Sequence, residues 1–70
     1  MPIIIAPLNT ELTIIKVLVD SKLKQHLESL GIIKNSKLKI IANTNGNVVC
    51  LIKDNKIALD KDVASKILVA

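Results

Sequence analysis

The sequence predicts a mainly β fold: a small barrel of about five short strands, with one short α-helix after the first strand and a helical turn before the last. Three observations support this prediction. Segments rich in β-branched residues alternate with turn residues, one segment has leucines at helical spacing, and the chain has only 70 residues. So few short strands avoid exposed edges best by curling into a barrel. The length allows a single hydrophobic core, so one domain is expected over residues 1–70.

The first strand is expected over residues 12–18, after nine residues that form an apolar arm with turn residues. The segment is rich in β-branched side chains, which favour a strand. Because side chains alternate between the two faces of a strand, it has two apolar faces. These are Thr13, Ile15 and Val17 on one face, and Leu12, Ile14 and Leu18 on the other. The strand is therefore expected to be partly buried on both sides.

A helix is expected next, because three leucines recur at the spacing of one helical face and predict a core-facing stripe. These leucines are Leu23, Leu27 and Leu30. Asp20 or Ser21 can cap the start of the helix, since a short side-chain oxygen accepts a hydrogen bond from a free N–H of the first turn. Gly31 is expected to end the helix in the left-handed conformation.

Two strands joined by a tight turn follow, at residues 37–42 and 48–53. Between them lies Asn45-Gly46, which favours a two-residue hairpin because both central residues of that turn need positive φ. In the second strand of the pair, alternation places three side chains on the inner face. These are Val48, Cys50 and Ile52.

The chain is expected to turn again at residues 54–55 into a strand at 56–59. Asp60 can cap one helical turn that runs through Ala64, and residues 66–69 form the last strand. The order of elements indicates a small barrel of the SH3-like or a related kind, with the helix covering one open end.

The net charge of +4 comes from 10 basic residues, all lysine, against 6 acidic ones. A basic chain suggests nucleic acid as a partner, but this one has no arginine for bidentate contacts and no aromatic ring for base stacking. The lysines are also scattered among carboxylates. A solvated surface is the favoured interpretation, and no nucleic acid is expected as a partner.

The location of the protein is predicted from what the sequence lacks. Its one cysteine, Cys50, rules out a disulfide within the chain and fits a reducing compartment. No signal peptide is visible, and no apolar run approaches the roughly 20 residues needed to span a bilayer. A cytoplasmic protein without membrane insertion is expected.

No catalytic or metal site is predicted. Cys50 lies among aliphatic residues of a strand, where core packing is expected, and His26 lies at the edge of the leucine stripe. A first-row metal site needs several converging ligands, and one histidine, one cysteine and dispersed carboxylates do not supply them. No enzyme and no cofactor are expected, and any association with Fe²⁺ would be weak or indirect. An interaction module remains, since small barrels bind partners through loops, edges and apolar residues.

Over nearly its full length, the chain resembles the ferrous iron transport protein A (FeoA) family of SH3-like domains. The resemblance rests on the order and spacing of five segments, not on any single motif. The segments are Ala6-Pro7-Leu8 with Glu11-Leu12-Thr13-Ile14, the helix end His26-Leu27-Glu28-Ser29-Leu30-Gly31-Ile32, the strand at 36–41, the hairpin at 45–49, and the ending at 57–69. Asn35-Ser36 stands where many members have Pro-Gly, and Asn9 where many have Gly.

The resemblance implies an accessory protein of ferrous iron uptake, which acts on the cytosolic region, including the GTPase domain, of the ferrous iron transporter FeoB. Residues on the helix and its exit are predicted to contact the partner: Lys24, His26, Glu28, Lys34 and Asn35. Two alternatives stay open: a basic barrel that binds nucleic acid, and a metal-sensing or oligomerisation module whose copies share a site built from His26 or Cys50. Whether the protein forms a homo-oligomer, and whether it activates or restrains transport, is left open.

Overall fold

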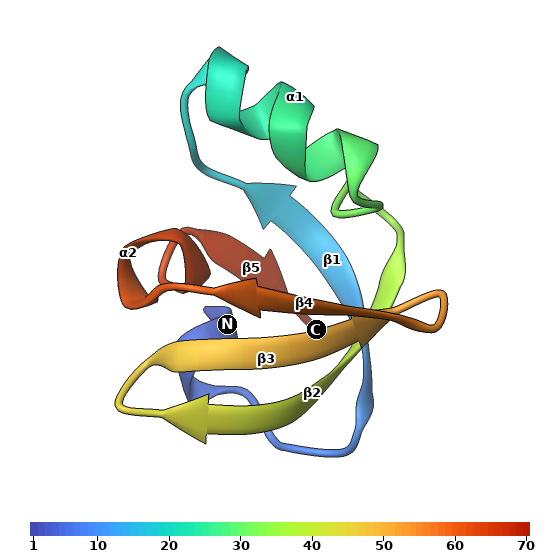
Figure 1. Cartoon of the computed structure of the whole chain (residues 1–70), viewed down its shortest axis with the longest axis vertical. Coiled ribbons are helices and arrows are strands. Elements are labelled where there is room, and N and C mark those ends of the chain that lie inside the picture. The colour runs from blue at the N-terminus through green and yellow to red at the C-terminus, as the bar shows by residue number, and fades with distance from the viewer.

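The computed structural model describes all 70 residues, which form a five-stranded antiparallel sheet in the order β4-β3-β2-β1-β5 (Figure 1). The strands are β1 (Glu11–Val17), β2 (Lys37–Thr44), β3 (Asn47–Ile52), β4 (Asn55–Leu59) and β5 (Ile67–Val69). The helices are a short 3₁₀-helix η1 (Ile3–Ile5), α1 (Ser21–Ser29) and α2 (Lys61–Ala64). The predicted fold class is confirmed, with a helix after the first strand and a helical turn before the last.

Both hairpins between β2, β3 and β4 have two-residue turns with positive φ at both positions. Asn45 and Gly46 have φ angles of 55° and 92°, as the sequence predicts for this turn. The second turn lies at Lys53 and Asp54, with φ angles of 49° and 69°, one residue earlier than expected. Asn55 already belongs to β4, where it pairs with Ile52.

β1 divides its pairing between two strands. It pairs with β2 over residues 11–13 and with β5 over residues 14–17, and a bulge shifts the register between Ile14 and Lys16. A bulge adds one residue to the strand, so the alternation of faces changes beyond it. The predicted faces are therefore wrong past the bulge: Val17 is buried with Leu12 and Ile14, while Leu18 is exposed.

The helix α1 begins and ends where the sequence predicts. Asp20 caps its start, because the Leu23 backbone N–H donates to Asp20 Oδ1 over 2.8 Å. At its end, Gly31 has a φ of +95°, the Gly31 N–H donates to Glu28 O, and the Ile32 N–H donates to Leu27 O. These two bonds define a Schellman motif.

The core assignment of Leu30 is wrong. Leu27 is buried and Leu23 is half-buried, but 37% of Leu30 is exposed. The helix ends at Ser29, so Leu30 lies past the last full turn. The Schellman motif brings the fully buried Ile32 back over Leu27 instead, which is the apolar contact that usually accompanies this motif.

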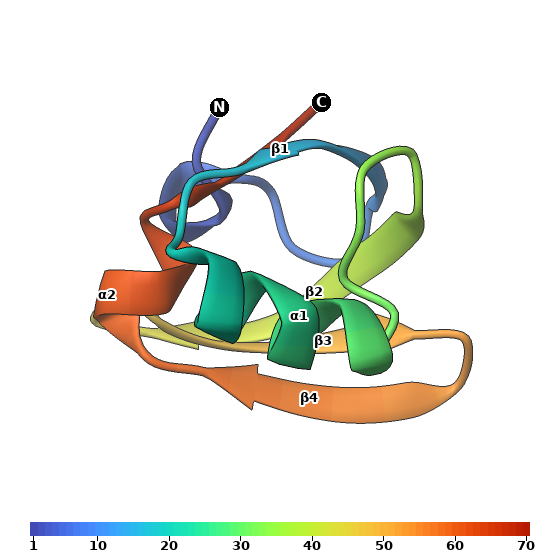
Figure 2. The ribbon, with the colours of Figure 1, turned by 90° about the horizontal axis from the view of Figure 1, so that it is seen from above.

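The core is entirely apolar and contains 16 buried residues. Val48, Cys50 and Ile52 of β3 belong to it, as expected. The first residues are more ordered than the expected arm: Ile3 in η1 is fully buried, and Pro2 forms a β-bridge with Leu68. The N-terminal segment therefore lies against β5, and both chain ends lie on the same side of the molecule (Figure 2).

Candidate partner-binding site

A groove of about 620 Å³ is lined by residues of β1, of α1 and of the loop that leaves the helix. Figure 1 shows where β1 and α1 lie in the fold. We call this groove the β1–α1 groove. Eight residues from these three segments line it: Ile15, Lys16, Val17, Lys24, Glu28, Ile32, Ile33 and Lys34. The groove is partly open to the surface, so it can admit a segment of another molecule.

The apolar part of the groove has a buried floor and exposed walls. Val17 and Ile32 are buried and belong to the core. Ile15 and Ile33 line the same groove but are 44% and 40% exposed. An aliphatic side chain in contact with water gains free energy when a partner covers it, at roughly 25 cal/mol per Å² of apolar surface. The groove therefore offers apolar surface that the fold itself does not cover.

The charged part of the groove is predominantly basic. Lys16, Lys24 and Lys34 line it with Glu28 as the single acidic residue, and all four side chains are exposed. Three segments supply the lysines: β1, α1 and the loop between α1 and β2 (residues 30–36), which we call the exit loop. A basic surface assembled in this way attracts anionic groups and repels cationic ones.

Backbone hydrogen bonds hold the exit loop in place beside β1. The Asn35 N–H donates to Ile14 O over 2.7 Å, and the Ile14 N–H donates to Ser36 O over 2.8 Å. Asn35 has a φ of 75°, which asparagine tolerates better than most residues. These bonds fix Ile33 and Lys34 opposite β1 and so form one end of the groove.

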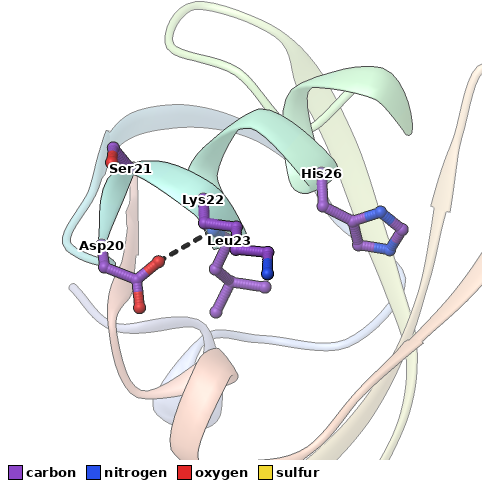
Figure 3. A pocket seen from close by; sticks show the side chains of 5 residues that line it. All are labelled: Asp20, Ser21, Lys22, Leu23 and His26. Atoms are coloured by element: carbon purple, nitrogen blue, oxygen red, sulfur yellow. Dashed lines mark hydrogen bonds between the residues drawn. The ribbon is translucent and has the colours of Figure 1, made fainter.

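The structure brings together three of the five residues predicted to contact a partner. Lys24, Glu28 and Lys34 line the groove. Asn35 does not line it, but its backbone anchors the loop. His26 lies elsewhere: it lines a shallow depression near the start of α1, shown in Figure 3 with Asp20, Ser21, Lys22 and Leu23.

The depression at the start of α1 offers little apolar surface, since Leu23 is its single apolar lining residue. Its only carboxylate, that of Asp20, accepts the capping hydrogen bond from the backbone of Leu23 (Figure 3). His26 is exposed and lies further along the helix, where Figure 3 shows its ring pointing away from Asp20. The β1–α1 groove is therefore the stronger candidate.

Sequence reasoning missed the β1 side of the groove. It placed Ile15 on a partly buried face with Val17, whereas the bulge turns Ile15 outward and Val17 inward. A bulge has no clear sequence signal in this segment, which contains neither glycine nor proline. For Ile33, the only sequence indication of a role in partner contact is that it adjoins Lys34, which is predicted to contact the partner.

Reactive groups do not cluster in the molecule. Cys50 is fully buried, and burial raises the pKa of its thiol to about 11, so the thiol is neutral near pH 7. A neutral buried thiol is a poor nucleophile. No group of three or more His, Cys, Asp or Glu side chains is placed to hold a metal ion. None of the helices has the length and apolar character needed to cross a membrane.

Comparison with known proteins identifies the family. The model of the FeoA domain family matches residues 1–70. A candidate Fe(2+) transport protein A from Methanocaldococcus jannaschii is 37% identical over 68 residues, which cover 97% of this chain and 83% of that protein.

Solved structures share the fold at lower identity. An iron uptake regulatory protein, FeoA, superposes with a TM-score of 0.88 at 16% identity, covering 99% of this chain and 93% of the other. Stenotrophomonas maltophilia FeoA, solved in complex with zinc and described as a prokaryotic SH3 domain protein, gives a TM-score of 0.82 at 20% identity, covering 100% and 89%. The fold is therefore SH3-like. Since the family model spans the whole sequence, this chain belongs to the FeoA family of ferrous iron transport proteins.

Proposed function

We propose that this protein is a cytoplasmic accessory factor of ferrous iron uptake. In this proposal, residues 1–70 act as a single domain that docks on the cytosolic region of the ferrous iron transporter FeoB, and the protein has no catalytic activity of its own. The observation that supports it is the match of the FeoA domain to the whole chain. The M. jannaschii relative bears the name of an Fe(2+) transport protein, and the S. maltophilia structure is described with a suggested role as a ferrous iron transport activating factor.

The β1–α1 groove is the surface that we propose for docking. It joins exposed isoleucines to lysines from three segments of the fold. Interfaces commonly have this composition, with apolar side chains at the centre and charged ones at the rim. Lys24, Glu28 and Lys34 would lie at the rim, and Asn35 would act by holding the loop. His26 remains a prediction for a wider contact that continues along α1.

An amide-shift titration tests the proposal directly. The ¹⁵N-labelled full chain is titrated with the cytosolic domain of FeoB, with and without a guanine nucleotide. We expect saturable shift changes centred on residues 15–17 and 32–34, and a comparison of the nucleotide states reports whether the GTPase cycle controls docking. An absence of shift changes at high concentrations of the domain would contradict the proposal.

A further inference from the structure

The β1–α1 groove also has the geometry to receive a strand. Resting on the docking role proposed above, we infer that it binds an extended acidic segment of the partner, which pairs with β1 as an added strand. Three features of the molecule support this inference: the pairing of β1, the direction of its backbone groups, and the side chains around the groove.

The edge of β1 that faces the groove has no strand beside it. β2 covers this edge only over residues 11–13, and the exit loop covers Ile14 through the hydrogen bonds to Asn35 and Ser36. From Ile15 to Val17 β1 pairs with β5 alone, on its other edge. Residues 15–17 are also the part of β1 that lines the groove.

Backbone groups of this edge point into the groove. The Leu18 N–H donates to Lys66 O on the β5 side over 2.7 Å. In an antiparallel pair, neighbouring residues direct their N–H and C=O groups to opposite edges. Val17 therefore directs its N–H and C=O toward the groove, as Ile14 does toward the exit loop. An added strand would find one donor and one acceptor at Val17, next to a loop that already pairs with Ile14 in a similar way.

The side chains around this edge indicate which residue types the partner's segment should contain. Ile15 and Ile33 offer apolar contacts, and Lys16, Lys24 and Lys34 outnumber the single Glu28. Successive side chains of a strand point to opposite faces. A segment in which aliphatic and acidic residues alternate can therefore contact the isoleucines with one face and the lysines with the other. A cationic segment would meet three lysines and be repelled.

The structure also distinguishes this edge from the two outer edges of the sheet, those of β5 and β4. The outer edge of β5 is met by the N-terminal segment, since the Val69 N–H donates to Met1 O and Pro2 forms a bridge with Leu68. β4 ends the sheet on the far side, and no hollow in the surface is lined by its residues. Only the β1 edge combines free backbone groups with a groove. At about 3.3 Å per residue, residues 15–17 span about 10 Å, and only Val17 offers its N–H and C=O over that length, so the paired segment is short.

The test uses the labelled full chain and a capped synthetic peptide of about seven residues in which valine and glutamate alternate. We expect saturable amide shifts at residues 15–17 and 33–34, and slower hydrogen exchange of the Val17 amide. A peptide with lysine in place of glutamate, and one with a central proline that lacks an N–H, should bind at least about tenfold more weakly. Equal binding of the lysine peptide, or shifts outside the groove, would overturn the inference.

Matched variants locate the contact on the protein. Ile15→Glu and Lys34→Glu should each weaken binding of the acidic peptide by about tenfold or more. Ile5→Glu and Lys53→Glu change the same residue types at exposed positions outside the groove, and should leave the affinity within about twofold. If the groove variants and their controls bind equally, the inference is wrong.

The same variants separate this inference from the proposed function. If the FeoB domain shifts residues outside the groove and its binding is unaffected by Lys34→Glu, docking stands and the strand inference fails. If the acidic peptide pairs with β1 while the FeoB domain does not bind, the strand inference stands and the partner is another protein.

Discussion

Seven residues of this chain have φ angles between +49° and +95°, and only two of them are glycine. The others are three asparagines, one aspartate and one lysine: Asn9, Asn35, Asn45, Asp54 and Lys53. Left-handed backbone costs a residue with a Cβ roughly 1–2 kcal/mol, and less for asparagine and aspartate. The β3–β4 turn, Lys53-Asp54, contains no glycine and so is less favourable than the β2–β3 turn, Asn45-Gly46.

Exchanging the turn dipeptides tests this difference. Changing Lys53-Asp54 to Asn-Gly should raise the free energy of unfolding by about 1 kcal/mol, because both new residues accept positive φ more readily. Changing Asn45-Gly46 to Lys-Asp should lower it by more than about 1 kcal/mol, since a Cβ at position 46 would lie 2.7 Å from Lys61 Cγ. Urea denaturation measures both changes, and effects of equal sign would contradict this account.

Cys50 predicts how stability depends on alkaline pH. Its pKa rises from 9.0 to about 11 on folding because burial disfavours the thiolate. Well below pH 9 the thiol is protonated in both states and contributes no pH dependence. Between pH 9 and 11 the unfolded chain loses this proton first, so stability falls, by about 2–3 kcal/mol in all.

The variant Cys50→Ala isolates this effect from the titration of the lysines. Its absolute stability is lower because a small cavity replaces the sulfur, but its stability should fall less steeply than that of the wild type from pH 9 to 11. Urea denaturation over this pH range gives both curves. Parallel curves would show that the burial of Cys50 does not control this loss.

At the scale of elements, α1 depends on one leucine more than on the others. Leu27→Ala should cost about 2–5 kcal/mol, since Leu27 is buried and packs at the Schellman turn. Leu30→Ala should cost less than about 1 kcal/mol, because Leu30 lies on the surface past the end of the helix. Thermal or urea denaturation of the two variants measures the difference. Equal losses would mean that the helix end packs differently.

Most elements could be predicted from local signals in the sequence. Asp20, Gly31 and Asn45-Gly46 act through their own backbone and nearest neighbours, so their roles are visible without tertiary structure. The bulge after Ile14 and the exposure of Leu30 could not be predicted. Both arise from how one element fits against another, since β1 must bend from β2 to β5 and Ile32 takes the core position near Leu27.

At the scale of the whole molecule, only one side of the β1–α1 groove could be predicted, because its two sides come from different parts of the sequence. The helix side of the groove, Lys24, Glu28 and Lys34, was predicted because these residues cluster along the sequence. The strand side, Ile15 and Lys16, comes from a segment that precedes the helix and meets it only in the folded protein. The burial of Ile3 in η1 has no local sequence signal for the same reason, since Ile3 enters a core built from distant strands.

The N-terminal segment should therefore be essential for stability. Ile3→Ala should lower the free energy of unfolding by about 2–5 kcal/mol, because Ile3 is fully buried. Ile5→Ala is the matched control: the same residue type, two positions along, is 67% exposed and should change stability by less than about 0.5 kcal/mol. Equal effects of the two substitutions in urea denaturation would contradict a role for this segment in the core.

The divided pairing of β1 has a consequence for how the protein folds. Its pairs with β2 join residues 11–13 to residues 37–39, and its pairs with β5 join residues 14–17 to residues 67–69. The hairpins of β2, β3 and β4 can form early from neighbouring residues. β1 acquires both of its neighbouring strands only after residues 14–17 meet residues 67–69. Contacts so distant in sequence slow folding, toward the millisecond-to-second range of all-β domains. During synthesis, β1 therefore stays without its β5 partner until residues 67–69 have been added.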